Sequence, residues 1–400
     1  MKPLLALVAA TTLTATSDAG TWIVDDDGGP GVDFLNVADA VAAASPGDRI
    51  FVHPGSYSGS VGSDKGLTIL GLGPGVNLVG VYLWHDIPLN QELRVVDVSC
   101  FRFSLFDCEG PVLFDGFTSS YSRFNLTGCR DVRAQGCTFS RCPVSVTDSR
   151  LELVDCEITG DDGSYGSFVS DGGPGGHALH VYSGGVVSLN ASTLRGGTGG
   201  DTPSTQSYGG DGGDGAHVDA GGELTITGTS ADIIFGGTAG QGPQQGDDGR
   251  GGDGVRNDGF LRASGASIVG GISPDYGDGV PVSGGGVFEA PVPADPFLKL
   301  QGEVRAGQQV DIEVRGEPGS VVRLLVGRAP ILAPYPASSD LRLTQPVRSF
   351  WIGNVPASGQ VVHSVVLPQT LTPGTRFVLQ AKLTTPLGDR LTNSAPLLAR

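Results

Sequence analysis

The sequence predicts an all-β protein in two parts, a stack of short strands over residues 20–290 and a β-sandwich over residues 297–400. Three observations support this fold class. Short apolar segments recur about every twenty residues between residues 100 and 160, and a longer glycine-rich repeat begins near residue 172. Toward the end of the chain, apolar and polar residues alternate in runs separated by Pro-Gly turns. The 65 glycines are more than double the usual share and are typical of a protein rich in turns.

The start of the chain has the pattern of an export signal. Met1, Lys2 and Pro3 precede an apolar stretch over residues 4–15, and Ser17-Asp18-Ala19 is a small-x-small cleavage site. We therefore expect a signal peptide over residues 1–19 and a secreted or cell-surface protein. No later apolar run reaches the roughly 18 residues that a membrane span requires, so no membrane span is expected.

Residues 33–57 predict one short helix followed by one buried strand. The apolar residues follow a helical period, and the brief apolar run at 50–52 ends in a Pro54-Gly55 turn. The helical stripe consists of Phe34, Val37, Ala38 and Val41.

This order of helix, Gly47-Asp48, strand and Pro54-Gly55-Ser56-Tyr57 resembles the opening of right-handed parallel β-helix proteins of the pectate-lyase-like superfamily. The resemblance implies that the helix caps the open end of a strand stack over residues 20–290, since such an end is an unpaired edge with exposed core. Together with the glycine-rich repeats, the layout also resembles bacterial extracellular β-helix repeat proteins.

The cysteines support a regular rung. All six lie between residues 100 and 156, where segments 112–119, 132–140 and 151–159 align with the period of about twenty residues. This alignment places Cys108 above Cys129. It also predicts one column of four residues: Cys100, Phe117, Cys137 and Cys156.

Stacked residues in neighbouring strands lie roughly 4.8 Å apart, within the Cα range that a disulfide tolerates. Cys108–Cys129 and Cys137–Cys156 are therefore candidate disulfides, because export allows oxidation. The alternative is an interior ladder of free thiols, since cysteine behaves as a small buried apolar residue. We expect no metal at the cysteines, because the sequence has no C-x-x-C pair there.

A longer repeat follows. Segments 175–181, 212–218 and 251–257 align with offsets of 37 and 39 residues, and each precedes a strand-like run. The simplest interpretation is one rung per repeat with a glycine-rich loop that points outward. Residues 209–216 fit the Gly-Gly-x-Gly-x-Asp pattern of calcium-binding β-rolls, although the tandem copies that such sites share are missing.

Clustered carboxylates in these loops are candidate calcium ligands, because calcium takes oxygen ligands. They are Asp211, Asp214, Asp247, Asp248 and Asp253. The alternative is a set of solvated Asp-Gly turns.

Histidines also recur in this repeat. His180 and His217 occupy equivalent positions, and Asp219 follows two residues after His217. Such a face can bind a metal or a ligand, or supply an acid and a base, and the alternative is a surface role in packing. Segment 228–236, which contains Asp232, is similar to the nucleophile segment of pectin methylesterases. That family's other motifs are missing from the sequence, so we assign no nucleophile.

Residues 297–400 predict an immunoglobulin-like β-sandwich of about seven strands after the proline-rich link at 290–296. The net charge of −17 argues against nucleic acid as a partner. We predict an exported β-helix scaffold or recognition protein that contacts polysaccharide or cell-surface components, and we assign no catalytic residue. The alternative is a polysaccharide lyase or glycoside hydrolase acting on an extracellular glycan. A lyase would need carboxylates beside a basic residue, and residues 160–290 offer only Arg195, Arg250, Arg256 and Arg262.

Overall fold

The structure is a computed structural model. It describes residues 19–168, 170–203, 207–227, 233–243, 248–290, 296–301, 306–327, 348–370, 376–386 and 388–398. The chain forms two compact units, of which the first ends at Ala290 and the second contains the strands from Phe297 onward. Residues 1–18 of the expected signal peptide lie outside the described residues. Within the described part of the chain, no helix is long and apolar enough to cross a membrane.

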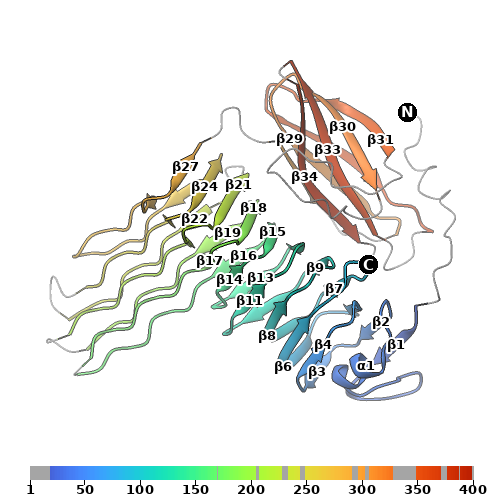
Figure 1. Cartoon of the computed structure of the whole chain (residues 1–400), viewed down its shortest axis with the longest axis horizontal. Helices are drawn as coiled ribbons and strands as arrows, with labels where there is room; N and C mark the ends of the chain where they lie inside the picture. The colour runs from blue at the N-terminus through green and yellow to red at the C-terminus, as the bar shows by residue number, and fades with distance from the viewer. Residues whose placement is uncertain are drawn as a thin grey trace. The chain divides into compact units, whose positions relative to one another are not determined.

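The first unit is a parallel β-helix whose strands form three ladders (Figure 1). The strands of the first ladder are β1 (Thr21–Val24), β2 (Arg49–Val52), β5 (Thr68–Gly71), β7 (Leu93–Val96), β9 (Val112–Asp115), β12 (Val132–Gln135), β15 (Arg150–Val154), β18 (Val186–Asn190), β21 (Glu223–Thr227), β24 (Phe260–Ser264) and β27 (Val287–Glu289).

The second and third ladders belong to one larger sheet, in which each pairs along its own line. The strands of the second ladder are β10 (Thr118–Ser120), β13 (Thr138–Ser140), β16 (Glu157–Thr159), β19 (Thr193–Arg195), β22 (Ile233–Phe235) and β25 (Ser267–Val269). Those of the third are β11 (Phe124–Thr127), β14 (Val144–Thr147), β17 (Leu179–Val181), β20 (Ala216–Val218), β23 (Val255–Asn257) and β26 (Val282–Ser283). The two ladders join through β3 (Gly55–Ser58), β4 (Val61–Ser63), β6 (Val76–His85) and β8 (Ser99–Phe106).

One short helix, α1 (Val37–Ala43), lies against β1, β2 and β4. Asn36 begins it, because its side-chain oxygen accepts a hydrogen bond from the Ala38 amide at 2.8 Å. Val37 and Val41 are buried in the core of the β-helix. The Lys65 ammonium group donates hydrogen bonds to three carbonyls at the other end of the helix, where a cation is favoured by the helix dipole.

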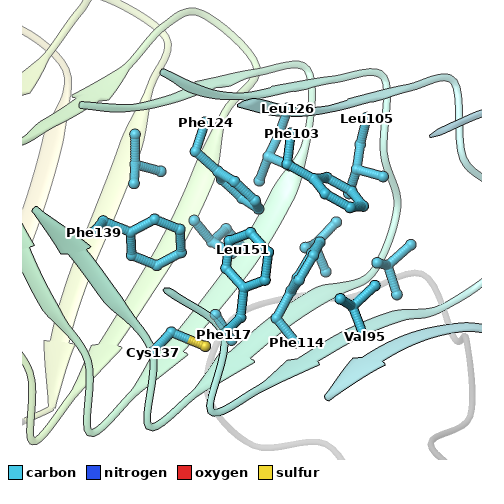
Figure 2. Packing of buried hydrophobic residues seen from close by; sticks show 14 of the residues in the cluster. Val95, Phe103, Leu105, Phe114, Phe117, Phe124, Leu126, Cys137, Phe139 and Leu151 are labelled. Atoms are coloured by element: carbon cyan, nitrogen blue, oxygen red, sulfur yellow. The ribbon is translucent and has the colours of Figure 1, made fainter. Parts of the chain in front are cut away.

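Aromatic rings from consecutive rungs fill the centre of the β-helix (Figure 2). Phe114 of the first ladder meets Phe103 at 5.0 Å between ring centroids and Phe117 at 5.1 Å, in edge-to-face geometry. Phe124 and Phe139 continue the stack at 4.9 Å. Each ring is almost fully buried, so the side chains that alternate inward along the strands form one continuous apolar core.

The predicted registers are confirmed except for one residue. Val112, Val132 and Leu151 pair in order, as the period of about twenty residues requires. Cys100, however, pairs with Ser119 and does not share the column of Cys137 and Cys156. The misplacement is two residues, so Cys100 still points inward, because side chains alternate with a period of two.

All six cysteines lie in the described chain as buried free thiols. Burial raises the pKa of Cys100 to about 12 and that of Cys142 to about 11. The candidate disulfide partners stack in parallel strands, where their side chains run parallel at a spacing of roughly 4.8 Å. That spacing meets the Cα requirement but exceeds the Cβ separation of roughly 3.5–4.5 Å that a disulfide needs. In the structure the cysteines thus form the interior ladder of free thiols.

Glycine-rich segments run outward from the second ladder and return to the third (Figure 1). We call them the glycine slab. The outgoing segments are residues 160–166, 196–202, 236–242 and 270–273, and the returning segments are residues 172–177, 208–215, 248–254 and 277–281. The prediction of one rung per long repeat is therefore confirmed. The extra residues of each repeat are inserted at one corner of the β-helix, between the second and third ladders.

The slab is held by backbone hydrogen bonds in a pattern of three. In Gly-Gly-x triplets the first glycine amide bonds within its own layer, as Gly196, Gly212 and Gly236 do to the carbonyls of Phe235, Arg250 and Val269. The second glycine amide crosses between the outgoing and returning layers. These cross-layer bonds form a continuous series of 2.7–2.9 Å, from Gly176 to Asp161, Gly197 to Gly176, Gly213 to Gly197, Gly237 to Gly213, Gly252 to Gly237, Gly271 to Gly252 and Gly279 to Gly271.

Aspartates at the third position complete the network. Asp211 accepts from the Arg250 amide at 2.7 Å, and Asp214 accepts from the Asp253 amide at 2.9 Å. Polyproline II chains have three residues per turn and no internal hydrogen bonds, and the triplet pattern of the slab is typical of them. In the slab, the backbone amides find their hydrogen-bond acceptors in neighbouring segments. Only glycine fits between the layers, because a Cβ at Gly237 would lie 1.9 Å from the Gly197 carbonyl oxygen.

The second unit contains two antiparallel sheets around one apolar core. One sheet consists of β28 (Phe297–Gln301), β29 (Gln309–Arg315) and β32 (Gln360–Val366). The other consists of β30 (Val321–Gly327), β31 (Arg348–Asn354), β33 (Arg376–Thr385) and β34 (Gly388–Leu398). Ile312 and Val314 from the first sheet share the core with Leu324 and Leu379 from the second, so the two sheets pack face to face.

Replacing Gly237 by alanine is expected to destabilise the protein by about 3 kcal/mol, because the new methyl group must displace a backbone carbonyl in a packed layer. Thermal unfolding followed by circular dichroism measures the effect. Gly62→Ala is the matched control, since a Cβ at Gly62 meets nothing within 4 Å. Equal melting temperatures for the two variants would contradict the close packing of the slab.

The thiols are expected to resist a disulfide reagent such as dithionitrobenzoate in the folded protein and to react completely after unfolding without reductant. Burial makes all six thiols inaccessible and raises the pKa of Cys100 and Cys142, and only thiolates react. Release of six equivalents of thionitrobenzoate per chain in denaturant would support the ladder of six free thiols. Reaction of Cys100 and Cys142 alone would instead show that both candidate disulfides form.

Candidate functional site

The outer face of the third ladder carries a row of aligned polar side chains. His180 pairs with His217 across β17 and β20, and His217 pairs with Arg256 across β20 and β23. In β17 and β20, the residues on either side of each histidine are buried, so the histidine side chain points outward. The predicted equivalence of His180 and His217 is therefore confirmed, and Ser145 and Ser283 extend the row on either side.

Asp219 connects the two histidines of this row. Its Oδ2 lies 3.2 Å from His180 Nε2, and its Oδ1 lies 3.4 Å from His217 Nε2. The two imidazole rings are nearly parallel, with centroids 4.6 Å apart and an interplanar angle of 5°. Consecutive rungs thus present two Nε2 atoms to one carboxylate.

A third histidine, His177, joins the group from the glycine slab. Its Nε2 lies 3.2 Å from His217 Nδ1, and its Nδ1 lies 3.2 Å from Asp214 Oδ2. The Asp214 amide also lies 3.2 Å from the same Nδ1. We call His177, His180, Asp214, His217 and Asp219 the histidine cluster.

Sequence reasoning did not select His177. A signal was present, because His177 precedes Asp214 by 37 residues and thus occupies the aspartate position of the Gly-Gly-Asp triplets. Asp214, one of the candidate calcium ligands, contacts this histidine.

An aromatic ring and a second charged pair border the cluster. The Tyr182 ring stacks on His180 with a centroid distance of 3.8 Å and an interplanar angle of 20°, and its side chain is exposed. On the next rung, Asp258 Oδ2 lies 3.9 Å from His217 Nε2 and 3.7 Å from Arg256 Nε. The face therefore combines imidazole, carboxylate, guanidinium and aromatic groups within neighbouring rungs.

Partial burial sets the charge of the cluster. It lowers the pKa of His180 and His217, because removing an imidazole from water disfavours its protonated form. The neighbouring histidines lower the pKa of His217 further. Burial alone would raise the pKa of Asp214, but the hydrogen bond and charge of His177 and the Asp253 amide outweigh it and leave that pKa below its ordinary value. Two neutral imidazoles beside an ionised Asp214 are therefore expected at neutral pH.

The other calcium candidates lie apart from this cluster. Asp211 and Asp253 each use one carboxylate oxygen to accept a backbone amide of a neighbouring slab segment, and Asp248 accepts from the Gly242 amide. Among the described residues, none of these three joins a group of three potential ligands. Asp247 lies outside the described residues, as does Asp232 of the esterase-like segment.

Of the four arginines available to a lyase, Arg256 alone lies beside the histidine cluster in the described structure. Arg195 lies over the Phe235 ring at 4.3 Å, and Arg250 pairs with Asp253 at 3.5 Å. Arg262 lies in the first ladder, where it pairs with Thr225. At the histidine cluster, the arginine and carboxylates that converge are Arg256, Asp219 and Asp258.

Comparisons with known proteins leave the family open. No family model and no curated protein matches the chain. Among solved structures, it is similar to the periplasmic alginate epimerase AlgG, with a TM-score of 0.22 and 11% identity over 64% of this chain and 84% of that chain. It is also similar to the enzymatically active domain of tailspike protein 2 from bacteriophage CBA120, with a TM-score of 0.22 and 10% identity over 87% of this chain and 72% of that chain. Similarities at this level establish no shared family or activity.

Stability is expected to fall as the pH decreases from 7 through the histidine range. The unfolded chain titrates near the ordinary value of 6.5, whereas His180 and His217 in the folded protein titrate lower, so the unfolded state binds more protons below that pH. Melting temperatures measured from pH 7.5 to 5 check this. The double variant H180Q/H217N should flatten the profile.

His85→Gln is the matched control for this experiment, because His85 lies on β6 outside the cluster and pairs with Asp86 at 2.9 Å. A profile that stays equally steep in H180Q/H217N would show that other groups cause the loss.

Proposed function

We propose that the protein is an exported β-helix scaffold and recognition protein that binds a polysaccharide along the outer face of its third ladder. The observation that carries the proposal is the row of His180, His217 and Arg256, flanked by Tyr182 and Asp219, on consecutive rungs. Strands in a ladder lie roughly 4.8 Å apart, so such a row offers polar groups at regular intervals along the stack. A chain of linked sugar units has matching regularity.

The chemistry of the face suits a sugar. Imidazole nitrogens and the carboxylates of Asp219 and Asp258 can accept hydrogen bonds from sugar hydroxyls, and Arg256 can donate them. The exposed ring of Tyr182 offers an apolar surface for the C–H face of a pyranose, while its hydroxyl stays in water. The net charge of −17 favours a neutral glycan over a polyanion, because a polyanion would be repelled.

The proposal includes the finer architecture expected from the sequence. Burial of Val37, Ala40 and Val41 against the first strands supports α1 as the cap of the β-helix, as in the pectate-lyase-like superfamily. The shared core of two antiparallel sheets supports an immunoglobulin-like second unit, which we assign to attachment at the cell surface. Such attachment would present the β-helix face to an extracellular glycan.

A second candidate function is cleavage of the bound glycan by a lyase or hydrolase. The specific observation in its favour is that Asp219 and Asp258 both approach His217 Nε2 and that Arg256 pairs with Asp258. A lyase needs a base close to carboxylates, and an inverting hydrolase needs two carboxyl groups roughly 6.5–9.5 Å apart. Asp219 and Asp258 are the pair to which this role would fall.

Binding to an array of neutral and acidic glycans is expected to reveal neutral ligands, and Tyr182→Ala should weaken that binding about tenfold by removing the stacking surface. The matched control is Tyr121→Ala, because Tyr121 is also exposed but lies over Arg141, outside the row. No binding to any glycan, or equal loss in the two variants, would contradict the proposed face.

Incubation of the same ligands with the protein separates the two functions. The recognition function predicts unchanged glycans, with no new reducing ends and no absorbance from unsaturated products. Product formation that disappears in Asp258→Asn and persists in Tyr121→Ala would instead establish the enzymatic function.

A further inference from the structure

We propose that His180, His217 and Asp219 form a binding site for a divalent transition-metal ion, for which Zn²⁺ is the natural probe. The site goes beyond glycan recognition, because it is defined by donor atoms of this chain alone. His180 Nε2, His217 Nε2 and a carboxylate oxygen of Asp219 lie within 4.8 Å of one another.

The relative orientation of these groups supports a shared ion. His180 Nε2 is buried and lies 3.2 Å from Asp219 Oδ2, yet it makes no hydrogen bond within the described structure. The nitrogen and the oxygen are therefore close without pointing at each other. His180 Nε2 and Asp219 Oδ2 can therefore both direct their lone pairs at a metal ion placed between them, as metal ligands do.

The type of donor selects the ion. Two imidazole nitrogens and one carboxylate oxygen form a common ligand set for zinc and other first-row metals, whereas calcium takes oxygen ligands alone. His180 and His217 are held on consecutive strands with fixed register, so their donor atoms are positioned before the ion arrives. Asp219 is partly exposed, which leaves an approach for the ion and open positions for water.

The remaining cluster residues supply the outer shell that metal-bound histidines require. Coordination through Nε2 places the His217 proton on Nδ1, which then donates to His177 Nε2 at 3.2 Å. The other proton of His177 then resides on Nδ1 and donates to Asp214 Oδ2 at 3.2 Å. Asp214 is itself fixed by the Asp253 amide at 2.9 Å. This assignment of tautomers satisfies both ring nitrogens of His177 and Nδ1 of His217. The hydrogen bond that the Asp214 amide donates to His177 Nδ1 in the structure is exchanged for one from Nδ1 to Asp214 Oδ2.

The glycine slab makes this outer shell possible. His177 and Asp214 belong to returning segments of consecutive repeats, directly before β17 and β20. Gly213, which precedes Asp214, lies so close to the Gly176 carbonyl that its Cβ would be 2.1 Å from the oxygen. Backbone hydrogen bonds between these two segments, from the Gly175 amide to the Asp211 carbonyl and from the Ala178 amide to the Asp214 carbonyl, bring His177 and Asp214 together at the edge of the site.

Calorimetric titration with Zn²⁺ tests the site, using the mature full chain without a histidine tag after treatment with a chelator. Wild-type protein is expected to bind Zn²⁺, and Asp219→Asn or H180Q/H217N should abolish that binding or weaken it at least 100-fold. His177→Gln should weaken it about 10- to 100-fold, as loss of an outer-shell partner does. His85→Gln, a surface histidine beside Asp86, should bind like wild type.

Cobalt substitution gives a second readout that does not depend on affinity. Bound Co²⁺ is expected to give visible absorption bands in wild type that are missing in H180Q/H217N at saturating metal, while melting curves show that both proteins are folded. Equal Zn²⁺ affinity in wild type and H180Q/H217N, or no binding in wild type, would overturn the site. These measurements contain no glycan, so failure of the glycan-binding function would leave their outcome unchanged.

Discussion

The constant register between consecutive rungs is the constraint on which the rest of this structure depends. Parallel backbone hydrogen bonds hold each strand directly above the previous one, so any residue is stacked on its equivalent in the neighbouring repeat. Inside the β-helix this register stacks the ring of Phe124 on that of Phe103, and Phe139 of the second ladder packs against Phe124 in the same core. Outside, the same register stacks His180 on His217 and creates the candidate site.

The glycine slab keeps the same constant register in segments that have no apolar core. An insertion in every rung would normally leave unsatisfied backbone groups and no buried apolar surface. Here the first glycine of each triplet bonds within a layer, the second bonds between layers, and aspartates such as Asp211 take the amide of the third residue. The acidic residues are therefore structural acceptors in this network, which accounts for the recurrence of Gly-Gly-Asp without requiring an ion.

The candidate site lies where these two kinds of structure meet. Strands β17 and β20 fix His180 and His217, and the returning slab segments fix His177 and Asp214 beside them. Neither part would suffice alone, because a strand face has no second layer of polar partners and the slab offers few functional side chains. Partial burial at this junction also keeps the imidazoles neutral, which suits hydrogen bonding to sugar hydroxyls as well as metal coordination.

The repeat lengths, the one rung per repeat and the alignment of His180 with His217 could be predicted from the sequence, because the hydrophobic period and the glycine spacing depend directly on register. It misplaced Cys100 by two residues, since alternation alone specifies the face of a strand but not its partner. The role of the triplets could be read only from the folded structure, because their hydrogen-bond partners lie in other repeats and in the opposite layer. For the same reason the folded structure alone brought His177 to His217: their contact spans forty residues and depends on how closely layers without side chains can pack.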